Sequence, residues 1–69
     1  MSEIVFLIEE AVEGGFTAKA LGASIITEAD DLARLRINVR DAVQCHFEVE
    51  ADRPKVIRLH FVHDEVIAS

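Results

Sequence analysis

The chain has 69 residues, and its 13 acidic and 7 basic residues give a formal net charge of −6. This length has room for one domain with one core. The charge argues against nucleic acid as a direct partner, because a phosphate backbone is bound through clustered Lys and Arg, and it favours a basic protein partner instead. Hydrophobic residues make up 51% of the chain, which is high for this length, so we expect a homo-oligomer, a dimer or larger, with apolar surface in its interface.

The sequence also bears on the cellular compartment. A single cysteine, Cys45, excludes an internal disulfide framework and fits a reducing cytosol. The N-terminus lacks the pattern of a signal peptide, and the longest apolar run, residues 4–8, is far too short to span a bilayer. We therefore expect a cytoplasmic protein that does not contact a membrane.

Residues 3–10 are expected to form the first strand, because they hold a short, β-branched apolar run between acidic residues. Alternation places Ile4, Phe6 and Ile8 on one face and Val5 and Leu7 on the other. A strand that is apolar on both faces is usually central and covered on both sides. One helix can cover only one of these faces, so the other face needs a second cover.

Glycines divide the next segment into two further strands. Gly14 and Gly15 predict a hairpin turn, because glycine adopts positive φ without a steric penalty. Residues 16–21 then alternate as a second, antiparallel strand, and Gly22 ends it. We expect residues 24–28 to return as a short third strand.

The segment 27–47 predicts an amphipathic helix of about four to five turns. Asp31 is the expected N-cap, although Arg34 stands where a capping box would have Glu or Gln. Arg34, Arg36 and Arg40 are interpreted as a solvated helix face that could instead contact an acidic patch of a second subunit. The apolar stripe, on which a buried or half-buried histidine is expected, comprises Leu32, Leu35, Val39, Ala42, Val43, His46 and Phe47.

A charged connector, residues 48–54, leads to the last strand, residues 55–62, which Pro54 can open. Residues 64–69 are expected to be a frayed end. The element order is therefore βββαβ, an α+β fold with an antiparallel three-strand meander and one helix packed on one sheet face. The helix crossover is long enough to place the fourth strand parallel to the first. We assign Phe6, Ile57, Leu59 and Phe61 to the helix side.

The opposite, open face of this sheet is the candidate interface. It is half apolar, which is unusual for a surface that stays in water and is typical of a contact region. The residues assigned to it are Val5, Leu7, Thr17, Lys19, Arg58, His60 and Val62.

The polar residues show no catalytic or metal-binding pattern. His60 and His63 point to opposite faces of a strand, so they cannot share a metal ion. Cys45 and His46, which are adjacent in the sequence, do not complete a set of converging ligands either, so we expect no metal. The acidic residues flanking the hairpin and the helix start are interpreted as solvated side chains in loops and at a cap. A glycine-rich phosphate loop, a nucleophile elbow and an HExxH motif are absent. We expect no catalytic residue and no cofactor.

Several short motifs resemble the HicB-like antitoxin domain. They are EGGFTAKAL, a strand ending at Thr27, and ADDLARLRINVRDAV, and the resemblance covers roughly residues 4–47. Ala29 stands where that family usually has Gly. The positions that match the family pattern are Gly14, Gly15, Phe16, Gly22, Thr27, Asp30, Leu32, Asn38, Asp41 and Ala42.

The resemblance implies that residues 1–69 form a single HicB-like domain with a partial ribonuclease-H-like fold. It further implies an antitoxin that occludes a HicA-like toxin, a small basic protein that cleaves messenger RNA. HicB antitoxins often carry a C-terminal DNA-binding domain, and the sequence ends after the fourth strand, so we expect no DNA binding. Nuclease activity is not expected either, because a ribonuclease-H site needs carboxylates in the middle of the first strand, where this chain is apolar.

Three functional hypotheses follow. The first is a stand-alone HicB-like module that sequesters a basic protein, for example a HicA-like toxin. The second, given equal weight, is a small self-associating accessory or structural protein without a toxin, whose open face is buried against a second copy. The third, an enzyme fragment or accessory subunit, ranks well below both because the sequence shows no catalytic constellation.

Overall fold

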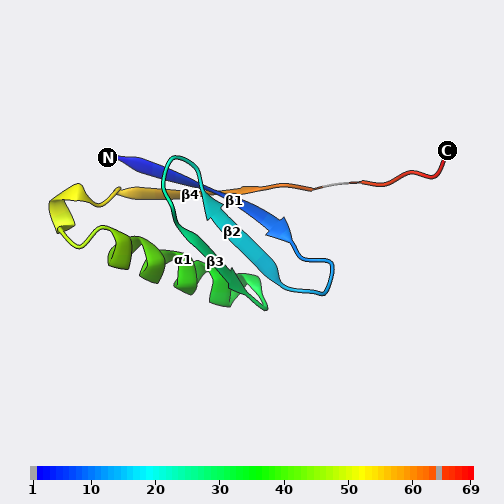
Figure 1. The fold of residues 1–69 in the computed structure, drawn as a ribbon, viewed down its shortest axis with the longest axis horizontal. Helices are drawn as coiled ribbons and strands as arrows, with labels where there is room; N and C mark the ends of the chain where they lie inside the picture. Colours follow the sequence, from blue (N-terminus) through cyan, green and yellow to red (C-terminus); the bar gives the residue numbers. More distant parts are fainter. Residues whose placement is uncertain (1, 64) are drawn as a thin grey trace.

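The computed structural model describes residues 2–63 and 65–69, and the elements follow the predicted order βββαβ (Figure 1). A short 3-10 helix, η1, lies in the connector between the helix and the last strand. The bounds of the elements are β1 Glu3–Glu10, β2 Phe16–Ala20, β3 Ile26–Ala29, α1 Leu32–His46, η1 Glu50–Asp52 and β4 Val56–Phe61. The predicted frayed end falls partly on Asp64, which is outside the described residues.

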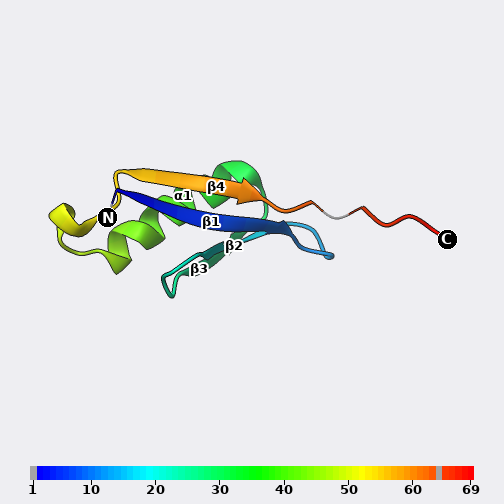
Figure 2. The same ribbon diagram turned by 90° about the horizontal axis from the view of Figure 1, so that it is seen from above.

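The four strands form one sheet in the order β3-β2-β1-β4. β1 pairs with β2 in antiparallel and with β4 in parallel orientation, so the predicted parallel fourth strand is confirmed. The register places Phe6 between Ala20 of β2 and Leu59 of β4. The helix α1 supplies the crossover that a parallel pair requires, and it runs along one face of the sheet (Figures 1 and 2).

The core lies between α1 and this covered face. β1 contributes Ile4, Phe6 and Ile8, and the small side chains of Ala18 and Ala20 in β2 leave room for the helix. The remaining buried hydrophobic residues are Ile25, Leu35, Val39 and Val43. Among the described residues, no polar or charged side chain is buried. The core is therefore held by apolar packing, as expected from the two periodic patterns.

The helix begins where the sequence predicts. The carboxylate of Asp31 accepts a hydrogen bond from the backbone N–H of Arg34 at 2.7 Å, which caps the first turn. Asn38 donates from Nδ2 to the backbone oxygen of Glu28 at 3.0 Å and ties α1 to β3. The expectation for His46 is wrong, because this side chain is exposed at the last position of α1, with its ring edge against Phe47 at 4.8 Å between centroids.

The third strand lies slightly later than predicted. Residues 24–28 were expected, whereas β3 spans Ile26–Ala29. The turn after β2 extends to Ile25, since the N–H of Ala20 donates to the backbone oxygen of Ile25 at 2.9 Å and Gly22 has a φ of 83°. The turn closed by this hydrogen bond therefore places the first β3 residue that pairs with β2 at Ile26.

The connector before β4 is held by a side chain that the sequence analysis did not single out. Arg53 donates from Nε to the backbone oxygen of Phe47 at 2.7 Å, and from Nη2 to that of Glu48 at 3.4 Å. Pro54 next to it is buried. The backbone oxygen of Ser2 then accepts from the N–H groups of Lys55 and Val56. These bonds position the start of β4 beside β1, so that the two strands pair in the observed register.

Candidate interaction surface

Strand register assembles the open face of the sheet. Because Ile4, Phe6 and Ile8 point toward α1, the alternate residues of β1 point away from it. Leu7 lies between Lys19 and His60, and Val5 lies beside Arg58. Thr17 lies beside Glu9 in the same row, and its Oγ1 donates weakly to the backbone oxygen of Glu9 at 3.5 Å.

The structure therefore places all the predicted interface residues on one face. Val62 directly follows β4 and continues its alternation, because its N–H donates to the backbone oxygen of Ile8 at 2.9 Å. Val5 and Leu7 are only half-buried, although β1 is an inner strand with a neighbour on each side. Their position on a common face is confirmed, and their role in an interface stays a prediction.

Two apolar residues of this face were missed as interface candidates. Val56 is 50% exposed and pairs with Glu3, while Ile26 is 73% exposed and pairs with Lys19. Val56 could have been found from the alternation of β4 alone. Ile26 could not, since its face depends on the late start and register of β3. Both residues extend the apolar part of the open face to its two edges.

A salt bridge lies at one edge of the open face. Arg58 donates from Nε to the Oε1 of Glu3, and this bond links β4 to β1. The hydrogen bond and positive charge of Arg58 hold the pKa of Glu3 below its ordinary value of 4.5. The same bond raises the pKa of Arg58. Because both side chains are exposed, we expect the pair to contribute little to the stability of the fold.

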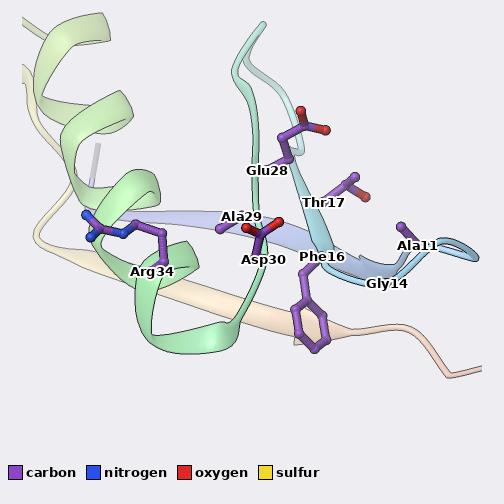
Figure 3. A pocket seen from close by; sticks show the side chains of 8 residues that line it. All are labelled: Ala11, Gly14, Phe16, Thr17, Glu28, Ala29, Asp30 and Arg34. Atoms are coloured by element: carbon purple, nitrogen blue, oxygen red, sulfur yellow. The ribbon is translucent and has the colours of Figure 1, made fainter.

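A pocket of about 380 Å³ lies where the β1–β2 hairpin, the end of β3 and the start of α1 meet (Figure 3). Its polar groups do not converge: in Figure 3 the guanidinium of Arg34 and the carboxylate of Glu28 point away from Asp30. A pocket suited to catalysis would bring such groups onto one substrate atom. The lining residues are Ala11, Gly14, Phe16, Thr17, Glu28, Ala29, Asp30 and Arg34.

Over residues 2–63 and 65–69, His, Cys, Asp and Glu side chains do not gather in groups of three or more that could hold a metal ion. Cys45, His46, His60 and His63 are all exposed. The one long helix of the described chain, α1, lacks the length and apolar character needed to cross a membrane.

Acidic residues gather at the hairpin end of the sheet. The register aligns Glu9 with Thr17 and Thr17 with Glu28, so both carboxylates lie in one row of the open face. Glu10 and Glu13 follow at the end of β1 and in the hairpin, and Asp30 follows β3. Five of the 13 acidic residues therefore lie on or beside this end of the open face, whereas Glu48, Glu50 and Asp52 lie in the connector before β4.

Two relatives resemble this chain over most of its length. It is 53% identical over 53 residues to a UPF0150 protein of Archaeoglobus fulgidus, an alignment that covers 77% of each chain. It is 41% identical over 66 residues to a UPF0150 protein of Thermotoga maritima, which covers 96% of this chain and 91% of the relative. No family model and no solved structure matches the sequence. On these identities and this coverage, the chain belongs to the UPF0150 family.

Proposed function

We propose that this protein is a HicB-like binding module that sequesters a small basic protein, a HicA-like toxin, through the open face of its sheet. The observation that carries the proposal is the half-apolar, uncovered face of an inner strand. Val5 and Leu7 lie in its centre, with Ile26 and Val56 toward its edges. An apolar centre surrounded by polar groups is the usual composition of a protein interface.

The charge distribution supports a basic partner. Glu9 and Glu28 belong to the open face itself, and Glu10, Glu13 and Asp30 lie at the adjoining end of the sheet. Acidic groups beside an apolar patch attract a cationic protein and orient it before contact. Binding through this surface should therefore be faster at low salt and should slow as salt screens the charges.

The same proposal gives the protein no catalytic role and no cofactor, and places it in the cytoplasm. The motif around Gly14, Gly15 and Phe16, and the Asp30-to-Ala42 segment, support the HicB-like assignment by their resemblance. A HicB-like module of this kind would act by covering the active surface of its partner.

A second candidate function, self-association through the same face in an accessory protein without a toxin, is favoured by the exposed Ile26 and Val56. The test that separates the two is capture of the tagged protein from its native lysate, followed by an RNA-cleavage assay of any stoichiometric basic partner. The proposal expects such a partner, and expects its RNA cleavage to stop when this protein is added back.

Two matched variants make the capture experiment specific to the open face. Val56→Glu places a charge on this face, and Ile37→Glu places one on the outer side of α1, at positions that are 50% and 49% exposed. We expect Val56→Glu alone to release the basic partner. If the capture recovers only further copies of this protein, and Val56→Glu no longer recovers them, self-association would be favoured. Recovery of the basic partner with both variants would place the binding surface elsewhere.

A further inference from the structure

The helix does not cover the whole of its side of the sheet. α1 packs mainly against β2 and β3, and β4 lies at the opposite edge of the sheet. Ile57 and Leu59 point to the helix side, beside Ile4 and Phe6, yet both remain half-buried. Between α1 and β4 lies a groove of about 300 Å³, which we call the α1–β4 groove. It is lined by Arg36, Val39, Arg40, Lys55, Ile57 and Leu59.

This groove is cationic in a protein that is acidic overall. Its apolar floor is bordered by Arg36, Arg40 and Lys55, which are three of the seven basic residues of the chain. Among the described residues, the salt bridge is formed by Arg58 and Glu3. No carboxylate of these residues lies within 4.0 Å of the charged groups of Arg36, Arg40 or Lys55. An occupant of the groove should therefore combine apolar side chains with negative charge.

The segment after β4 has this chemistry. Val66 and Ile67 are adjacent, apolar and 94% and 80% exposed, and Glu65 precedes them. Residues 65–69 lie beyond the end of β4 and away from the rest of the molecule (Figures 1 and 2). The groove lies beside Lys55, Ile57 and Leu59, before the end of β4, so the segment points away from the groove of its own chain.

We propose that the α1–β4 groove binds residues 65–67 of a second copy of this chain. Val66 and Ile67 pack on Ile57 and Leu59, while Glu65 lies near Arg36 and Arg40. Two copies that exchange these segments form a closed, two-fold symmetric dimer in which both grooves are filled. This interface lies on the helix side of the sheet, so it leaves the open face free and does not depend on the proposed partner binding.

The test is the dimer dissociation constant of the full chain, measured by sedimentation equilibrium. Replacing both Val66 and Ile67 by Ser should weaken the dimer about tenfold or more, because it removes most of the apolar contact. These residues lie outside helices and strands, so the variant keeps the fold. Val12→Ser, at a fully exposed position of the β1–β2 hairpin, is the matched control and should leave the dimer unchanged.

A charge exchange tests the register of the contact. Arg40→Glu and Glu65→Arg should each weaken the dimer, and the combined variant should recover most of the lost affinity, since the opposite charges face each other again. A monomeric wild-type chain, or a dimer that keeps its affinity when Val66 and Ile67 are replaced, would overturn the proposal. A dimer that dissociates in Val56→Glu but survives the tail substitutions would assign self-association to the open face instead.

Discussion

The two faces of β1 differ far more in burial than in composition. Ile4, Phe6 and Ile8 are at most 2% exposed, whereas Val5 and Leu7, which alternate with them, remain half-buried. The difference comes from α1, whose Leu35, Val39 and Val43 share one core with the first row and leave the second row uncovered. An apolar row within a sheet is therefore a core only where another element covers it, and the uncovered row is available to a partner.

The largest expected effect is on the covered side. Leu35→Asp should unfold the protein, because the side chain is fully buried and a carboxylate there has no partner. Loss of the helical circular dichroism signal at neutral pH would show this. Ile37→Asp, on the outer side of the same helix, should remain folded. A folded Leu35→Asp variant would contradict the assignment of the helix stripe.

Truncation of neighbouring side chains in β1 compares the two faces directly. Phe6→Ala should lower the free energy of unfolding by about 3–5 kcal/mol, since it opens a cavity in the core. Leu7→Ala, on the half-buried face, should cost less than half as much. Urea unfolding of both variants measures the difference. Equal losses would mean that the open face is covered in solution, and a concentration dependence would identify a second copy as the cover.

Enlarging side chains in β2 should give a smaller contrast. Ala18 is fully buried beneath α1, so Ala18→Leu should overpack the core and cost about 1–3 kcal/mol. Lys19→Leu, the next residue on the open face, should change stability little while increasing the apolar area exposed there. Thermal unfolding measures both. An unchanged melting temperature for Ala18→Leu would show that the helix can move away from the sheet.

The smallest effect concerns the salt bridge at the edge of the open face. The folded-state pKa of Glu3 is lowered by Arg58, so the contribution of the pair is complete above the unfolded pKa of Glu3 and is lost as pH falls through the folded pKa. Glu3→Gln should therefore be slightly less stable than the wild type at neutral pH and equal to it in strong acid. Urea midpoints at several pH values would show whether this convergence occurs.

Most of the local structure followed from short-range patterns. The bounds of β1, the capping of α1 by Asp31 and the positive φ of Gly14 and Gly15 match the expectations from sequence. Alternation also assigned the predicted interface residues to one face, because the period of a strand does not depend on its neighbours. Gly15 proved to be under a further constraint, since a Cβ at this position would meet the backbone oxygen of Ala29 at 2.9 Å.

By itself, the sequence determined which segments are strands or helix and which side chains share a face. Only the tertiary structure decided that β3 begins at Ile26, that His46 is exposed, that Arg53 holds the connector, and that α1 leaves a cationic groove beside β4. Local patterns arise from backbone periodicity within a few residues. Register, lateral helix position and the grooves between elements depend instead on packing and hydrogen bonds between segments far apart in the chain.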